Sequence, residues 1–256
     1  VFGLKPTYGR ISRAGSFLFV ASLDHLGPLA RSTVDLALAL DATAGHDPDD
    51  PVSMERDHAP LVRTALEEGA HGLRIARLGG YFERQGEPEA FDAVERVCRA
   101  LDVTRRVELP EVERARAAAF VISATEGGNL HLPRLRAHAA DYDPDTRDRF
   151  LAGALAPAAW YVQAQRFRRW FRKRVLELFE TVDVLIAPAT PVTAPGLGQK
   201  TIRVAGSEIP LRANLGIFTQ PLSFVGLPVV TVPLQRRGAL PIGVQIIAAP
   251  WREDQV

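Results

Sequence analysis

Two groups of side chains are of types that suit metal binding, but their spacing does not. His131 and His138 are seven residues apart on a predicted helix, about 10 Å along its axis and too far to share one ion. Asp47, Asp49 and Asp50 lie in a predicted turn that lacks the glycine and glutamate of a calcium-binding EF-hand loop. We therefore predict two partly exposed helical histidines, a solvated aspartate turn and no metal site.

Basic and aromatic side chains alternate between Trp160 and Val182, as they do in some nucleic-acid-binding segments. The apolar residues recur every three or four positions, which places them on one side of a helix. They are Trp160, Ala164, Phe167, Phe171, Val175, Leu178 and Val182. The basic residues fill the other face. The spacing favours an amphipathic helix packed on the core, and we expect no nucleic-acid partner.

The residues alone supply no complete catalytic motif. The sequence has no G-x-S-x-G elbow, no H-E-x-x-H zinc motif, no P-loop and no G-x-G-x-x-G after a strand. The one cysteine, Cys98, lies on the apolar face of a predicted helix, which indicates a buried structural thiol rather than a nucleophile. A lysine-based mechanism is limited to Lys5, Lys173 and Lys200.

The first half of the chain predicts strands and helices in alternation. Residues 1–30 are rich in glycine, proline and serine and are interpreted as loop with short extended pieces. Ser32 caps a helix that ends near Gly45. Residues 73–110 form a strand–helix–strand unit. This alternation favours an α/β layer in which helices pack on a sheet.

The second half begins with helices and ends with strands. Residues 112–182 are mostly helical, with breaks near 141–144 and at Pro157. Three further strands are predicted at 184–187, 229–234 and 243–249. A turn at 236–238 joins the last two strands. The sequence therefore predicts a single α/β domain without an internal boundary.

Composition limits the class of protein. Of the 256 residues, 46% are hydrophobic and 24% are charged, as in an ordinary globular protein with a real core. The net charge of +1 gives no general field that would attract nucleic acid or an anionic membrane. No apolar run approaches the roughly 20 residues needed to span a bilayer. Because the chain begins at Val1 and its only methionine is Met54, we expect it to be part of a longer polypeptide.

Three ordered blocks resemble the amidase signature hydrolases. They are residues 3–13 (GLKPTYGRISR), residues 22–32 (SLDHLGPLARS), and a third block at 183–191 (DVLIAPATP), 226–228 (GLP) and 241–245 (PIGVQ). Within that family the chain most resembles the 1-carboxybiuret hydrolases of cyanuric acid degradation. The residues behind this finer resemblance are 125–132 (TEGGNLHL), 159–166 (AWYVQAQR), 218–221 (FTQP) and 248–253 (AAPWRE).

The resemblance covers essentially the whole chain. It implies an α/β amidase-signature fold, a mixed β-sheet core covered by helices on both faces. Residues 1–256 would form a single incomplete amidase domain, its C-terminal part, which lacks the upstream catalytic segment. An isolated chain of this kind is expected to be inactive and to expose apolar surface.

The resemblance also implies a mechanism. One serine of a Ser–cis-Ser–Lys triad attacks the amide carbon, the lysine acts through the second serine as general base, and backbone N–H groups hold the oxyanion. The family places this triad upstream of Val1, so no residue of this chain is assigned as catalytic and Lys5 is given a structural role. A cytoplasmic enzyme is implied that needs no metal or organic cofactor and forms a homodimer or binds a small accessory subunit.

The substrate side of the family's site falls within this chain. Arg149 resembles the arginine that binds the substrate carboxylate in glutamine-handling members, a task that suits a bidentate guanidinium; a surface helical arginine is the alternative. Gly216 aligns with the aspartate that binds the substrate amino group in those members. Asn129, Thr219 and Gln220 are candidates to bond a ureido group, or simply cap loops.

These residues fit a substrate that has a carboxylate and no ammonium group. The expected function is therefore hydrolysis of a small carboxylated urea-type amide, such as 1-carboxybiuret, with release of ammonia. Two alternatives stay open. One is another amidase-signature enzyme, such as an aryl or aliphatic amidase or a glutamyl-tRNA amidotransferase A-like subunit. The other is an inactive fragment that acts only in binding.

Overall fold

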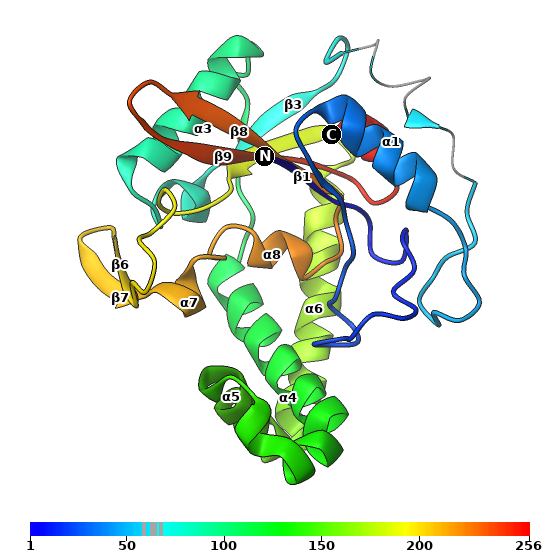
Figure 1. Cartoon of the computed structure of the whole chain (residues 1–256). Helices are drawn as coiled ribbons and strands as arrows, with labels where there is room; N and C mark the ends of the chain where they lie inside the picture. Colours follow the sequence, from blue (N-terminus) through cyan, green and yellow to red (C-terminus); the bar gives the residue numbers. More distant parts are fainter. Residues whose placement is uncertain (58–59, 62–65, 67–68) are drawn as a thin grey trace.

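The computed structural model describes residues 1–57, 60–61, 66 and 69–256. The described residues form a seven-stranded mixed sheet in the order β2-β1-β8-β9-β5-β3-β4 (Figure 1). Its strands are β1 (Phe2–Lys5), β2 (Leu29–Ala30), β3 (Ile75–Leu78), β4 (Arg106–Val107), β5 (Val184–Pro188), β8 (Val229–Arg236) and β9 (Ala239–Ala248). The strand β3 pairs in parallel with β4 and β5, and the other pairs are antiparallel.

Helices pack on both faces of this sheet. The helices of the described residues are α1 (Thr33–Thr43), α3 (Pro88–Ala100), α4 (Val112–His138), α5 (Pro144–Ala154), which packs on α4 away from the sheet, α6 (Ala158–Leu178), α7 (Leu211–Asn214) and α8 (Gln220–Ser223), with 3-10 turns η1 (Gly80–Glu83), η2 (Ala139–Asp141) and η3 (Glu253–Gln255). Side chains of α4, α6 and α8 share a core with Leu185 and Ile247, whereas α3 packs on Ile186 and α1 on Val230. Because successive strand residues point to opposite faces, these helices form two layers around the sheet.

Local signals placed most of these elements correctly. The Ser32 hydroxyl accepts a hydrogen bond from the Asp35 N–H at 3.1 Å and caps α1 as predicted. The predicted breaks separate α4 from α5 and α5 from α6, which begins after Pro157. The strand β5 is buried along its whole length. The fold is α/β with a mixed sheet, as predicted.

Residues 192–228 contain structure that the sequence did not predict. A separate hairpin of β6 (Thr201–Val204) and β7 (Ser207–Pro210) forms there, followed by the short helices α7 and α8. Ile202 and Val204 alternate with exposed residues along β6, but the run is too short to stand out from the surrounding loop. These elements matter because α8 lines the candidate site described below.

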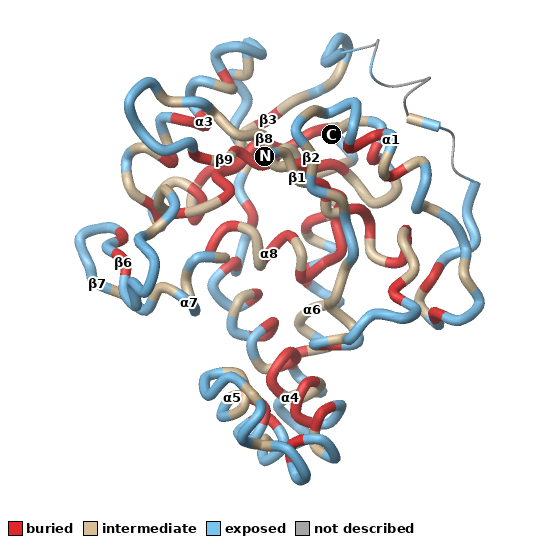
Figure 2. Tube along the Cα trace, viewed as in Figure 1, coloured by how far each residue is buried: buried red, intermediate tan, exposed pale blue. Residues whose placement is uncertain are grey.

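The amphipathic helix α6 differs from its prediction at two residues. Trp160 is 60% exposed rather than packed, because α6 begins at the end far from the sheet (Figures 1 and 2). Arg168 does not belong to a solvated face: its guanidinium donates to the Phe224 carbonyl at 2.8 Å and to the Ser22 carbonyl at 2.9 Å. The middle of the predicted stripe is correct, since Ala164, Phe171 and Val175 are buried.

Candidate functional site

A cavity of about 590 Å³ lies against the central strands β1, β8 and β9. The segment 25–29 forms one wall, and α8 with the residue before it forms another. Its polar lining residues are Lys5, His25, Thr219, Ser223, Thr231 and Gln245. The volume is in the range of small-molecule sites, so this cavity is the centre of the candidate site.

Lys5 is held between two backbone carbonyls. Its amine donates to the Pro6 carbonyl at 3.1 Å and to the Leu227 carbonyl. Burial lowers the pKa of Lys5 to about 7, and the charge of Glu253 opposes this effect. The side chain therefore ties the end of β1 to the residues that lead into β8.

His25 presents a neutral imidazole in the same wall. Its Nδ1 lies 2.6 Å from the Leu23 carbonyl, so we assign the ring proton to Nδ1. The Nε2 atom is buried and has no hydrogen-bond partner among the described residues. Burial, followed by the charge of Lys5, lowers the pKa of His25 to about 3. The Nε2 atom of His25 is thus a hydrogen-bond acceptor for which the described residues provide no donor.

This burial predicts a pH dependence of stability. As the pH falls from 6.5 to about 3, the unfolded chain takes up a proton that folded His25 does not. The free energy of unfolding should therefore decrease over that interval. A His25→Asn variant, whose amide can still donate to the Leu23 carbonyl, should show a weaker decrease in denaturant titrations at several pH values. The same change at exposed His46 is the control and should retain the wild-type decrease.

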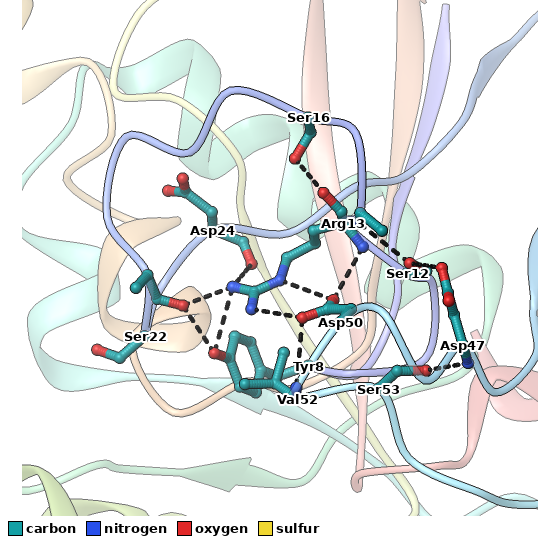
Figure 3. Close-up of polar contacts among 12 residues, drawn as sticks. Tyr8, Ser12, Arg13, Ser16, Ser22, Asp24, Asp47, Asp50, Val52 and Ser53 are labelled. Atoms are coloured by element: carbon teal, nitrogen blue, oxygen red, sulfur yellow. Dashed lines mark hydrogen bonds and ion pairs between the residues drawn. The ribbon is translucent and has the colours of Figure 1, made fainter. Parts of the chain in front are cut away.

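Arg13 fixes the loop that leads to His25 (Figure 3). Its backbone N–H and its Nε atom donate to Asp50 Oδ2 at 2.9 and 3.1 Å, and Nη2 donates to Oδ1 at 3.0 Å. Its Nη1 atom donates to the carbonyls of Ala21 and Asp24 and to the Tyr8 hydroxyl. Arg13 therefore joins the start of the loop, its end and the turn at Asp50.

The predicted solvated aspartate turn is wrong for one of its three carboxylates. Asp50 is 4% exposed, and its hydrogen bonds with Arg13 lower its pKa to about 2. The half-buried Asp47 accepts a hydrogen bond from the Ser12 hydroxyl through its carboxylate. Asp49 is exposed. One carboxylate of the turn, that of Asp50, is thus buried, because Arg13 binds it from a segment that is distant in sequence.

The helix α5 places Arg149 against α4. The guanidinium lies 4.4 Å from the ring centre of Phe120 and 5.8 Å from that of Phe19, and it donates to the Ser123 hydroxyl. Its Nε atom is buried without a hydrogen-bond partner, and no described carboxylate forms an ion pair with it. Burial lowers the pKa of Arg149. The Arg149 guanidinium is therefore a partly desolvated cation that has hydrogen-bond donors without partners among the described residues.

The link between α7 and α8 packs on the same stretch of α4. Arg116, one turn before Phe120, donates to Gln220 Oε1 at 3.1 Å and to the Ala213 carbonyl at 3.0 Å. Thr219 Oγ1 donates to the Gly216 carbonyl at 3.3 Å. Gln220 thus contacts α4 one turn before Phe120, Thr219 and Gly216 are bonded to each other in the adjoining link, and Thr219 also lines the cavity.

Asn129 does not join this group. It is exposed on α4, thirteen residues beyond Arg116, which corresponds to about 20 Å along the helix axis. Asn129 is also six residues beyond Ser123, and at 3.6 residues per turn its side chain points about 120° away from that of Ser123. The structure therefore separates Asn129 from Gly216, Thr219 and Gln220.

Four polar residues of the cavity lining were not singled out from the sequence: His25, Ser223, Thr231 and Gln245. His25, Ser223 and Thr231 carry no spacing signal, because their significance arises from the cavity that separate segments form. Gln245 is a polar residue in the otherwise apolar run of β9, a pattern that indicates a buried group with partners. Its amide donates to the Pro188 carbonyl at 2.7 Å and to the Phe218 carbonyl at 3.3 Å.

The other candidate residues have structural surroundings. Cys98 is 3% exposed, as predicted, and burial raises its pKa. The prediction for His131 is wrong: it is 5% exposed and stacks on Phe150 with ring centres 4.9 Å apart. Exposed His138 lies 3.6 Å from Asp141. In the described parts of the chain, no three His, Cys, Asp or Glu residues are grouped to hold a metal, and no helix could cross a bilayer.

The chain is similar to known proteins along its whole length. The chain is 50% identical to AtzE, a 1-carboxybiuret hydrolase subunit of Pseudomonas sp. (strain ADP), over 99% of this chain and 56% of that protein. It is 31% identical to the A subunit of the glutamyl-tRNA(Gln) amidotransferase of Moorella thermoacetica, over 99% and 56% of the two chains. The chain therefore spans about half the length of these relatives.

A solved structure is similar throughout. It belongs to an inhibitor-bound vestigial protein complex that reveals the evolutionary origins of an s-triazine catabolic enzyme, and it matches 100% of this chain and 56% of its own with 50% identity and a TM-score of 0.96. A family model described as Amidase matches residues 1–256. The chain belongs to the amidase signature family.

Proposed function

We propose that the protein hydrolyses an amide bond in a small carboxylated urea-type substrate such as 1-carboxybiuret and releases ammonia. Two observations carry this proposal: the Arg149 guanidinium has no ion pair with a described carboxylate, and position 216 of the α7–α8 link carries no carboxylate. The 50% identity to a 1-carboxybiuret hydrolase subunit supports it. We assign the bond-breaking step to a Ser–cis-Ser–Lys triad outside residues 1–256.

Arg149 suits a substrate carboxylate for two reasons. Its planar guanidinium can make two parallel hydrogen bonds to the two carboxylate oxygens. It is also partly removed from water by Phe19 and Phe120, so its attraction for an anion is less screened than at an open surface. The Ser123 hydroxyl accepts from one side of the group, and Nε is a buried donor without a partner among the described residues.

Gly216 argues against an amino-acid substrate. A Cβ atom built there would meet only Thr219 Oγ1, at an ordinary contact distance of 3.4 Å, so packing does not require glycine at this position. An aspartate that could bind a substrate ammonium is therefore absent although the space for its Cβ exists. The arrangement fits an anionic substrate without an amino group.

An Arg149→Ala variant tests the proposal. Losing hydrogen bonds to a charged group should reduce kcat/KM for 1-carboxybiuret by about 10- to 100-fold, or about 1.5–3 kcal/mol, and spare the neutral substrate biuret. Ammonia release by the full-length protein is the measurement. Arg147→Ala is the matched control, because Arg147 lies on the same helix and pairs with Asp148 at 2.8 Å. An equal loss on biuret would contradict a carboxylate-binding role.

A Gly216→Asp variant tests the other half of the argument. The fold should be retained because the position has room, and the new carboxylate should repel a carboxylated substrate. We expect activity on 1-carboxybiuret to fall relative to activity on glutamine. A wild-type protein that already prefers glutamine would overturn the substrate assignment while leaving the amide hydrolase in place.

We also infer that residues 1–256 are one part of a larger domain. The edge strand β2, the loop before it and the neighbouring α1 expose large apolar side chains: Leu26 (41%), Leu29 (78%), Val34 (47%) and Leu38 (52%). An exposed strand edge beside apolar side chains usually needs a cover. We propose that further chain of the same polypeptide covers it. The relatives named as subunits suggest in addition a small accessory subunit or a homodimer.

A further inference from the structure

A second cavity, of about 560 Å³, lies beside α6 and shares no lining residue with the cavity at β1. Arg168, Arg169 and Arg172 of α6 line it, and none of its lining residues is acidic. Val52 and Met54 of one segment and Val225 of another supply apolar wall. A concave site of this size with a mixed lining suits a small molecule rather than a single ion.

Two of the three arginines are free to bind a ligand. Arg168 is partly buried and is occupied by the carbonyls of Phe224 and Ser22. Arg169 and Arg172 are exposed, and neither has a hydrogen bond or an ion pair with any residue that the structure describes. They are three positions apart on one helix, so their Cβ atoms are about 5–6 Å apart and the two guanidinium groups can act on one ligand.

Two buried carboxylates near this cavity do not neutralise it, because each is already paired with another arginine. Glu253 is buried against Arg10 at 2.8 Å, and Asp50 is buried against Arg13. Trp251, which also lines the cavity, has the Arg56 guanidinium 4.7 Å from its ring centre. The cavity is therefore positive on its α6 side and at Trp251.

We propose that this cavity binds a small organic dicarboxylate. Its two carboxylates pair with Arg169 and Arg172, since a guanidinium matches a carboxylate in shape and hydrogen bonding. Its carbon frame lies against Val52, Met54 and Val225. An inorganic anion would leave this apolar wall unused, and 51%-exposed Met54 has side-chain surface for a ligand to cover. The proposal does not depend on the proposed amidase activity.

Calorimetric titration with isophthalate tests it, with the neutral isophthalamide as the control ligand. Because two exposed ion pairs are lost, an Arg169→Gln/Arg172→Gln variant should bind isophthalate about tenfold more weakly. The matched variant is Arg166→Gln/Lys173→Gln, which removes the same charge from the same helix outside the cavity lining. It should bind as tightly as the wild type does.

Four results would overturn the proposal. They are no isophthalate binding at millimolar concentration, equal binding of isophthalamide, equal binding of sulfate, and an equal loss in the two double variants. Equal loss would mean that the charge of α6 as a whole attracts the ligand. All substituted side chains are exposed, so unchanged thermal unfolding of each variant checks that the fold is intact.

Discussion

An Asp50→Asn substitution is expected to lower the free energy of unfolding by about 3–5 kcal/mol, because it leaves the buried charge of Arg13 without a partner. The side chains of Arg13 and Asp50 are only 4% and 3% exposed, so water cannot replace the lost interaction. The amide would also turn an NH2 group toward a guanidinium that has only donors. Denaturant titration at neutral pH measures the change.

Asp49→Asn is the control for this substitution. Asp49 is exposed one residue away, so its replacement should change stability by at most about 0.5 kcal/mol. The low pKa of Asp50 adds a second signature. The stability that its ionised form contributes is present above the ordinary carboxyl pKa of 3.8 and is lost as the pH falls toward about 2. A loss below about 1 kcal/mol at neutral pH would mean that Arg13 finds other acceptors.

A Gly153→Ala substitution is expected to destabilise the protein by about 3 kcal/mol or more, at the upper end of the range for overpacking. A Cβ atom at Gly153 of α5 would lie 1.9 Å from the carbonyl oxygen of Ala124 on α4, and this obstacle is backbone that cannot rotate away. Alanine favours a helix by about 1 kcal/mol over glycine, which offsets only part of the cost.

The same change should also disturb substrate binding, because Arg149 lies one turn before Gly153 on α5. Gly128 of α4 makes the reciprocal contact, with a built Cβ only 2.5 Å from the Phe150 carbonyl. Thermal unfolding checks the loss of stability. Gly196→Ala is the control, since a Cβ there would meet only Gln199 Oε1 at 3.7 Å. A Gly153→Ala protein as stable as this control would show that α5 can shift without cost.

Local chemistry accounts for the elements that the sequence predicted correctly. Ser32 begins α1 through a bond to a residue three positions away, and Pro157 limits α6 through its own ring. These effects involve neighbours in the chain, so a single sequence reveals them. The β6–β7 hairpin was missed because two four-residue strands carry too little periodicity to distinguish them from loop.

The wrong predictions of exposure for His131 and Asp50 have a different cause, because each side chain is buried by a partner that is distant in sequence. His131 is buried because α5 folds back and stacks Phe150 on it. Asp50 is buried because Arg13 reaches it across 37 residues. The residues of the candidate site divide into the same two groups, those that a sequence can reveal and those that depend on distant partners. Family resemblance singled out Arg149 and Gly216, whereas the neutral state of His25 depends on burial by other segments and then on the charge of Lys5.

The position of β1 between β2 and β8 also sets the order of assembly during synthesis. Gly3 of β1 pairs with Thr231 of β8, so β1 waits for 228 further residues before this partner exists. At about 5–20 residues per second, the ribosome needs roughly 10–45 s to supply it. Among the described strands, β1 can pair only with the two-residue β2 during that time. Nascent chains of this protein should therefore depend on chaperones until β8 emerges.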